Sequence, residues 1–532
     1  MLTLRKAMRL SVLFVLLLVA ACAPLATPTP PPVPNDVIVE QPTQAMEMMD
    51  EPTPYPLADM PMEATATAPG QSQGSNNEPY DMFFQNYGVN PSIDTEDDHL
   101  STFALDVDTG SYTVMRNYLS DGNLPPAASV RVEEYINFFE QGYPQPPAHQ
   151  AFGISIDGAP SPFTQTERYQ MLRVGIQGYQ IDNADRKDAA LTFVIDVSGS
   201  MEMDNRLGLV KRSLELLVEQ LRPTDTVSIV VYGSEAHRVL DPTPGSQKGE
   251  ILSAIYGLHT EGATNAEAGI RLGYKIAMQG YMRDGINRVI LCSDGVANVG
   301  QTGPDAILGE IDHYVEEGVT LTTIGFGMDN YNDTLMEQLA DKGDGFYAYV
   351  DTMDEARRLF VDQITGTLQT IAMNAKVQVD FNPDVVLRYR LVGFENRAIA
   401  DNQFRDNSVD AGEIGAGHTV TALYEIKLNP DAYGRIATVN MRWEDPDTHA
   451  ITEISKDFNA DQLAYDFQEA DPYFQRAVVV AEYAEILKES YWAEDSSLQD
   501  VYREAQRIRE YLSQDEQMKE FVDLVRRASR LK

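Results

Sequence analysis

The sequence predicts an α/β protein built around a doubly wound, mostly parallel β-sheet, flanked by a β-sandwich and followed by a helical tail. In the central third, apolar runs typical of fully buried strands alternate with segments whose apolar residues recur at helical spacing. Before and after this region, apolar and polar residues alternate with a period of two, which indicates strands with one buried face. The repeated strand–helix alternation in the centre favours a parallel sheet.

The central domain is expected at residues 186–370. It begins with a continuous apolar strand at 190–195, which is followed by a helix at 205–221. The remaining predicted elements are strands at 226–232, 288–292, 319–324 and 345–350, and helices at 265–279, 304–317, 333–340 and 353–368. Ligands of such sheets bind at the carboxyl ends of the strands, so the functional site is expected at that edge.

The flanking segments are expected to form one sandwich. Period-two strands are predicted at 152–156, 171–176, 377–381, 420–426 and 437–443. We assign an N-terminal flanking domain to 91–185, a β-rich domain to 371–460 and a helical C-terminal region to 461–532. Because the strands lie on both sides of the central domain, the outer segments are expected to fold only together.

The C-terminal region shows helical signals. Asp471-Pro472 predicts a helix start, because Asp favours the N-cap and Pro is tolerated in the first turn. An apolar stripe then follows at Leu498, Val501, Ala505, Ile508 and Leu512. Such a stripe indicates a packing surface rather than a ligand site.

Residues 1–22 are predicted to be a lipoprotein signal peptide. Arg5, Lys6 and Arg9 precede an apolar run at 10–21, which is too short to span a membrane. The run ends in Val-Ala-Ala followed by Cys22, which resembles a bacterial lipobox. That resemblance implies cleavage before Cys22 and lipidation of its thiol. The alternative is a plain signal peptide that is cut nearby.

Residues 23–90 are predicted to be a disordered tether. They are rich in proline, threonine, alanine and glutamine, a composition that favours an extended, semi-stiff chain. A tether next to a lipidated cysteine predicts an extracytoplasmic protein that is lipid-anchored to the cell membrane or cell surface.

Composition and missing motifs exclude several functions. The chain has 81 acidic and 41 basic residues, a net charge of −40, and such a surface repels nucleic acid. Its two cysteines, Cys22 and Cys292, exclude a disulfide scaffold, and Cys292 is expected to be an inert core residue. Asp108-Thr109-Gly110 occurs once, whereas aspartic proteases need two carboxylates. Zinc-hydrolase and phosphate-loop motifs are absent from the sequence, and we expect no enzyme activity.

Oxygen-bearing side chains are expected to meet at one edge of the central sheet. Asp196, Ser198 and Ser200 follow the first strand, Thr264 precedes a helix, and Asp294 follows the strand at 288–292. Carboxylates and hydroxyls are hard donors that suit Mg²⁺, or another divalent cation such as Mn²⁺ or Ca²⁺. The alternative is that these residues are helix caps and turn residues of a metal-free domain.

Asp196, Ser198, Ser200, Thr264 and Asp294 together resemble the metal-ion-dependent adhesion site of von Willebrand factor type A domains. The resemblance implies that Ser198 and Ser200 ligate the ion directly and that Thr264 does so directly or through water. It implies that Asp196 and Asp294 act largely through bridging water. It also implies an open coordination position, which an Asp or Glu of a protein or peptide ligand would fill.

The resemblance covers roughly residues 188–368. Segments 102–112 and 131–139 are in turn similar to the region that precedes this domain in a group of bacterial surface lipoproteins of poorly defined role. Three functions follow as hypotheses. The first is a surface-anchored binding module, the second a structural or assembly lipoprotein in which the metal only stabilises the fold, and the third a metal-assisted hydrolase.

The lipobox generates a direct prediction. Cys22→Ser removes the thiol that would be acylated, so the protein should move from the membrane pellet to the soluble fraction after cell fractionation. An unchanged share in the membrane pellet would contradict lipidation at this cysteine.

Overall fold

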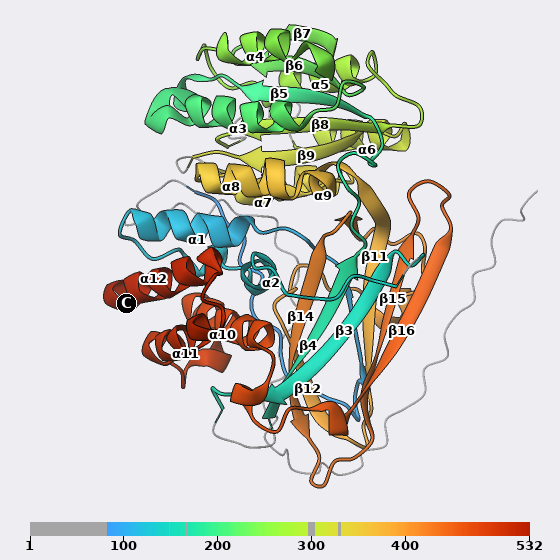
Figure 1. Ribbon diagram of the computed structural model, residues 1–532, viewed down its shortest axis with the longest axis vertical. Helices are drawn as coiled ribbons and strands as arrows, with labels where there is room; N and C mark the ends of the chain where they lie inside the picture. Colours follow the sequence, from blue (N-terminus) through green and yellow to red (C-terminus); the bar gives the residue numbers. More distant parts are fainter. Residues whose placement is uncertain (1–81, 148, 165–168, 296–303, 328–330) are drawn as a thin grey trace, which may run out of the picture. The chain divides into compact units, whose positions relative to one another are not determined.

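The computed structural model describes residues 82–532 except 148, 165–168, 296–303 and 328–330 (Figure 1). The described residues belong to one compact unit. The predicted signal peptide, Cys22 and nearly all of the predicted tether lie outside the described residues. The predicted α/β fold, with its sandwich and helical tail, is confirmed.

The central domain contains a six-stranded sheet. Its strand order is β10-β9-β8-β5-β6-β7. The bounds are Ala189–Asp196 (β5), Thr226–Tyr232 (β6), Ala236–Pro244 (β7), Ile286–Ser293 (β8), Thr320–Gly325 (β9) and Tyr347–Tyr349 (β10). Pairing is parallel except between β6 and β7. In the central strand, Phe193 is paired with Ile229 on one side and Ile290 on the other.

Helices cover both faces of this sheet (Figure 1). One face packs against α3 (Arg206–Gln220), α4 (Lys248–Tyr256), α8 (Met353–Arg357) and α9 (Ile364–Leu368). The other packs against α5 (Ala266–Ala277), α6 (Pro304–Glu316) and α7 (Asp333–Asp341). The predicted helix at 353–368 is instead interrupted by a π-helical turn at Arg358–Asp362.

Two elements of the central domain were not predicted, β7 and α4. β7 is an edge strand with a weak burial pattern, and it contains Pro242 and Pro244. Prolines weaken the sequence signal for a strand and are tolerated only at sheet edges. α4 is short and buries few side chains, Ile251 and Ile255 among them.

The sandwich consists of two sheets. The first has the order β1-β12-β14-β4-β3, and the second β13-β11-β15-β16 with β2 also paired to β11. The bounds are Ile93–Asp94 (β1), Leu100–Ala104 (β2), Phe152–Pro160 (β3), Tyr169–Gly178 (β4), Thr370–Phe381 (β11), Val386–Val392 (β12), Gly412–Gly415 (β13), Thr419–Leu428 (β14), Arg435–Glu444 (β15) and Ile451–Asn459 (β16). Strand β4, from before the central domain, pairs with β14, from after it. The prediction of one sandwich built from both sides is therefore confirmed.

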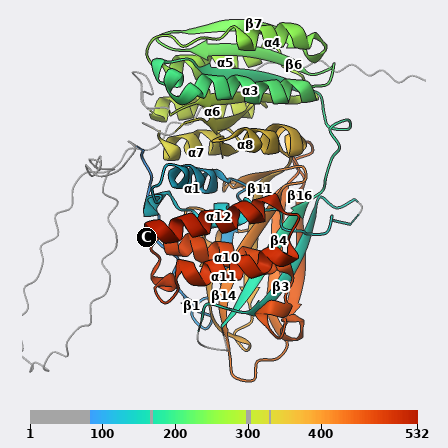
Figure 2. The same ribbon diagram turned by 60° about the vertical axis from the view of Figure 1, so that its left-hand side comes forward.

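Helices of the N-terminal flank pack with those of the C-terminal region. Their bounds are Gly110–Ser120 (α1), Val132–Asn137 (α2), Pro472–Leu487 (α10), Leu498–Tyr511 (α11) and Glu516–Leu531 (α12). The C-terminal helices lie side by side (Figure 2). Asp471 caps α10 by accepting from the backbone N–H groups of Tyr473 and Phe474, as the sequence predicted. The flank was expected to be mostly β-structure, so α1 and α2 correct that prediction.

Buried arginines join the central domain to its flanks. Arg131 donates to Asp333 Oδ2 at 2.6 Å and also pairs with Glu134 beside it. Arg116 forms a two-point ion pair with Asp351, with distances of 2.7 and 2.6 Å. These charges are almost wholly removed from water, so each depends on its partner.

We predict that Arg131→Ala lowers the free energy of unfolding by about 3–5 kcal/mol, because Asp333 and Glu134 would be left buried without their cation. Chemical denaturation monitored by circular dichroism measures the change. Arg405→Ala is the control. Arg405 is 66% exposed and pairs with Glu453, so its loss should cost less than about 1 kcal/mol. Equal effects of the two substitutions would contradict the role given to Arg131.

Candidate metal centre

Asp196 is the last residue of β5, and its side chain is fully buried. Its Oδ1 accepts a hydrogen bond from the backbone N–H of Ser198 at 2.8 Å. Its Oδ2 accepts from the hydroxyl of Ser293, at the end of the adjacent strand β8, at 3.0 Å. The carboxylate is thus fixed by its own loop and by the neighbouring strand end.

The hydroxyls of Ser198 and Ser200 face each other. Their Oγ atoms lie 3.1 Å apart. Ser198 precedes the 3₁₀ segment Gly199–Asn205, but its side chain makes no capping hydrogen bond there. Two adjacent ligands of an octahedral ion with bonds of about 2.0–2.1 Å are separated by about 3 Å. The two hydroxyls therefore have the spacing of neighbouring metal ligands.

Thr264 lies on a second loop, just before α5, and is half-buried. This loop is joined to the first by two backbone hydrogen bonds, from Gly199 to Gly262 at 3.2 Å and from Glu261 to Val197 at 2.5 Å. Gly262 has a φ of +71°, which favours glycine. Thr264 is thereby held on a loop that is bonded to the residue between the two serines.

Asp294 follows β8 and pairs with a cation that the sequence analysis missed. Arg206 Nη1 donates to Asp294 Oδ2 at 2.8 Å, and both side chains are buried. A Cβ at Gly327 would overlap the Arg206 side chain, so glycine leaves room for it. Arg206 is the first residue of α3, where the helix dipole disfavours a positive charge. An arginine at this unfavourable position was therefore the feature of the sequence that could have predicted a buried anionic partner.

The electrostatics of the site favour a bound cation. Burial raises the pKa of Asp196 to about 6, and the neighbouring carboxylate of Asp294 adds to the rise. The hydrogen bonds from Ser198 and Ser293 act in the opposite direction. A carboxylate that is removed from water attracts a divalent cation more strongly than it would in water, and the neighbouring hydroxyls provide further oxygen ligands.

The structure thus brings Asp196, Ser198, Ser200 and Asp294 to one edge of the sheet, with Thr264 on the adjoining loop. Asn265, which the sequence analysis did not single out, is the residue that caps α5, because its side chain accepts from Ala268 N at 3.2 Å. Ser293 belongs to the strand end that the sequence pointed to, but its role as a hydrogen-bond donor to Asp196 was not predicted.

A buried thiol and a cluster of three carboxylates lie apart from this centre. Cys292 is fully buried, and burial raises the pKa of its thiol, which keeps it protonated. In the described part of the chain, Asp344, Asp410 and Glu413 place one carboxylate oxygen each within 4.8 Å of one another. Burial raises the pKa of Asp344 to about 6, and the neighbouring carboxylate of Asp410 adds to the rise. The sequence did not predict this group.

Three family models match the chain. Residues 190–363 match the von Willebrand factor type A domain, residues 78–173 match a model described as von Willebrand factor, and residues 366–531 match the C-terminal region of the uncharacterized protein YfbK. The first match coincides with the six-stranded sheet and its helices. The second covers the flank whose sequence was similar to the region preceding such domains.

Two relatives are similar to this chain over half of its length or more. The uncharacterized protein YfbK of Escherichia coli is 38% identical over 72% of this chain. The uncharacterized protein sll0103 of Synechocystis is 26% identical over 52% of it. The matched region spans 66% of the length of each relative, slightly under two thirds. A solved von Willebrand factor type A protein from Catenulispora acidiphila is 14% identical, covers 70% of this chain and 88% of its own, and has a TM-score of 0.42.

Proposed function

We propose that this chain, which contains a von Willebrand factor type A domain at residues 190–363, binds a protein or peptide ligand through a divalent metal ion at the carboxyl edge of its central sheet. The observation that supports this most directly is the pair of serine hydroxyls, Ser198 and Ser200, 3.1 Å apart with no capping bond from Ser198. Hydroxyls that served only as caps would bond to backbone N–H groups instead.

The residues present fit Mg²⁺ or a similar hard cation. Ser198 and Ser200 would hold the ion directly, Thr264 would do so directly or through water, and Asp196 and Asp294 would act largely through water. When bound, the ion supplies a Lewis-acidic centre for an external carboxylate. Neutral hydroxyls offset little of its charge, so an exposed Asp or Glu of a partner is the expected ligand.

Arg206 strengthens this preference for an anionic partner. Its ion pair with Asp294 neutralises one of the two carboxylates near the centre. The net negative charge near a bound divalent cation is therefore smaller than that of two carboxylates. An external carboxylate then gains more by approaching the site.

The proposal assigns binding rather than catalysis. A metal-assisted hydrolase needs a free general base beside the reacting water. Asp196 is engaged by Ser198 and Ser293, and Asp294 by Arg206. The two carboxylates assigned to the metal centre are thus both already committed to structural contacts.

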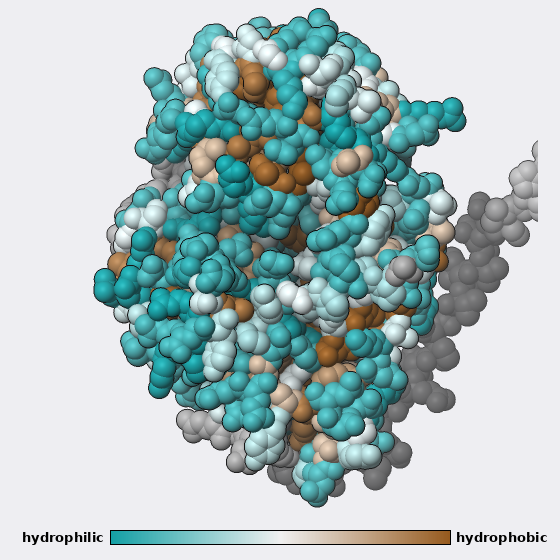
Figure 3. All heavy atoms as spheres, in the orientation of Figure 1, coloured by the Kyte–Doolittle hydropathy of each residue, from teal (hydrophilic) through white to brown (hydrophobic). Residues whose placement is uncertain are grey.

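We place this binding activity outside the cytoplasm, on a protein anchored by lipid at Cys22. The support is the lipobox-like sequence and the acidic composition. Within the described ranges, none of the helices combines the length and the apolar character needed to cross a bilayer. The face shown in Figure 3 is mostly hydrophilic.

A structural or assembly role, in which the metal only stabilises the fold, is the competing function. A pull-down from cell-envelope extract separates the two. Partners retained with Mg²⁺ but released by EDTA, and lost with Asp196→Ala, support metal-bridged binding. Retention that ignores both EDTA and Asp196→Ala would favour the structural role.

Metal binding itself should be visible as thermal stabilisation. At free Mg²⁺ of about ten times Kd, the folded state gains about 1.4 kcal/mol, which raises the melting temperature by about 3–6 °C for a domain of 150–250 residues. Asp196→Ala should abolish the shift and Thr264→Ala should weaken it. Asp241→Ala, an exposed carboxylate on β7, is the matched control and should keep the full shift. A full shift in Asp196→Ala would disprove this site.

The contribution of Arg206 can be measured separately. Arg206→Gln removes a positive charge from the neighbourhood of the ion, so Mg²⁺ should bind at least about threefold tighter by isothermal titration calorimetry. Arg206→Lys retains the charge and should leave the affinity near that of the wild type. Equal affinities for the wild type and Arg206→Gln would show that Arg206 does not act on the ion.

A further inference from the structure

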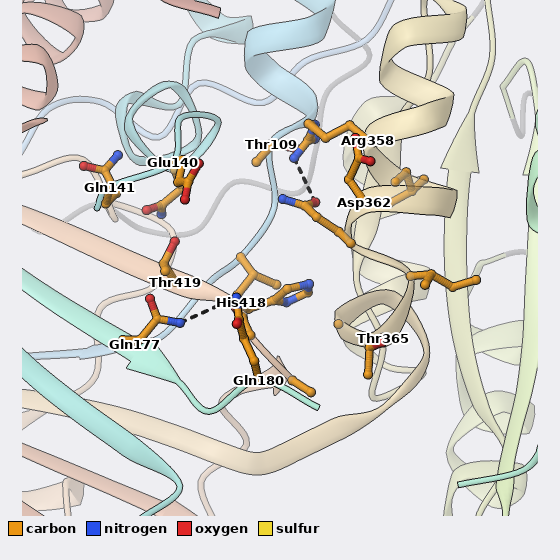
Figure 4. Close-up of a pocket in the computed structure, with 18 of the residues that line it drawn as sticks. Thr109, Glu140, Gln141, Gln177, Gln180, Arg358, Asp362, Thr365, His418 and Thr419 are labelled. Carbon is orange, nitrogen blue, oxygen red and sulfur yellow. Dashed lines mark hydrogen bonds between the residues drawn. The ribbon is translucent and has the colours of Figure 1, made fainter. Parts of the chain in front are cut away.

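A large open cavity lies between the central domain and the sandwich. Its volume is about 680 Å³, within the range of small-molecule sites. The two segments that connect the domain to the sandwich, near 177–183 and 363–366, both line it. Figure 4 shows Gln177, Gln180 and Thr365 of these segments near His418, which directly precedes β14. A ligand here would contact both parts of the molecule, well apart from the residues proposed to hold the metal.

The lining is rich in side-chain amides and hydroxyls. The residues of this kind are Thr109, Asn137, Gln141, Gln145, Gln177, Gln180, Asn183, Gln363, Thr365, Thr419 and Gln517. Among the described residues, the side chains of Gln180 and Thr365 make no hydrogen bond to another side chain or to the backbone. Asn137, which is 9% exposed, has a buried Nδ2 without a partner. The cavity therefore offers donors and acceptors that the protein itself does not satisfy.

The charges in the cavity disfavour an anionic ligand. Arg358 is committed to Glu355, to Gln363 at 3.0 Å and to Thr109 at 2.9 Å. Burial, aided by nearby arginines, lowers the pKa of His418 to about 4, so its ring is neutral at neutral pH. Exposed carboxylates of Glu140 and Asp362 add negative charge at the rim.

Two half-buried aromatic rings also line the cavity, Tyr143 and Phe346. The Tyr143 ring packs over Gly175, where a Cβ would overlap it, and its hydroxyl is 2.9 Å from that of Thr421. Phe346 lies edge-on to His418, with ring centroids 6.3 Å apart. The guanidinium groups of Arg173 and Arg288 lie over the rings of Tyr143 and Phe346, 5.0 and 6.0 Å from the respective centroids. Both rings are thus fixed in place, and their exposed parts add apolar area to an otherwise polar wall.

We propose that this cavity binds a neutral saccharide. Each sugar hydroxyl both donates and accepts hydrogen bonds, as the side-chain amides of the lining do. The apolar C–H groups of a sugar ring would contact the parts of Tyr143 and Phe346 that remain exposed. Among the described residues that line the cavity, Arg358 is the only side chain with a positive charge, and it is already engaged. A phosphorylated or acidic ligand would therefore meet Glu140 and Asp362 without a free cation to hold it, and a lipid would meet a wall that is mostly polar.

The test uses full-length protein in mild detergent. Saturation-transfer NMR is recorded with three neutral probes, the trimers of N-acetylglucosamine, maltose-type glucose and cellulose-type glucose, and with trialanine and trilysine. We expect saturable binding of at least one saccharide. The variant Gln180→Ala/Thr365→Ala should weaken it at least tenfold, because two hydrogen-bonding groups are lost. Gln403→Ala, an exposed glutamine outside the cavity, is the matched control and should leave the affinity unchanged.

Three outcomes would overturn the proposal. These are no saccharide saturating below 10 mM, binding that the double variant leaves unaltered, or saturation by a tripeptide with none by the saccharides. The metal proposal is tested apart from this one, since Asp196→Ala should leave saccharide binding intact. Loss of Mg²⁺ binding alone would therefore leave the cavity assignment in place.

Discussion

Three arginines fix the position of the central domain on its flanks: Arg116 and Arg131, which are buried, and Arg397, whose side chain is 12% exposed. A guanidinium that is removed from water is tolerated only when carboxylates surround it at close range. Arg397 is surrounded by carboxylates in this way. It donates to Asp106 at 3.0 Å, to Glu337 at 3.0 Å and to Asp341, and so joins three separate segments. These contacts leave little freedom in how the parts meet.

The same contacts explain why the flank contains the motifs it does. In Asp108-Thr109-Gly110, the carboxylate accepts from the backbone N–H of Tyr347 at 2.9 Å, and Gly110 leaves room for the Tyr347 ring. Glu134 accepts from the N–H of Ser111 at 2.7 Å. Burial raises the pKa of Glu134, and the neighbouring Arg131 opposes that rise. The Asp108-Thr109-Gly110 sequence, which resembles a protease triplet, thus serves to connect the flank to β10 of the central sheet.

The candidate metal centre and the polar cavity use the fold in different ways. The centre is built from loops that follow parallel strands, so its residues meet wherever that sheet forms. The cavity depends on how the domain sits against the sandwich, because its lining comes from both. Substitutions that shift the central domain against the sandwich would therefore alter the cavity and leave the loops of the candidate metal centre largely intact.

The sequence by itself determined the features that rest on local spacing. The alternation of strands and helices, the five oxygen-bearing residues from Asp196 to Asp294 and the capped start at Asp471 all lie in short stretches that a period or a motif reveals. Helices α1 and α2 were not predicted from the sequence, because nearly every side chain in them is buried. A helix without a polar face shows no alternation of apolar and polar residues at helical spacing. Only the tertiary structure decided that β4 pairs with β14, that Arg206 meets Asp294 and that the cavity forms. These contacts join residues far apart in the chain, and packing rather than local propensity selects them.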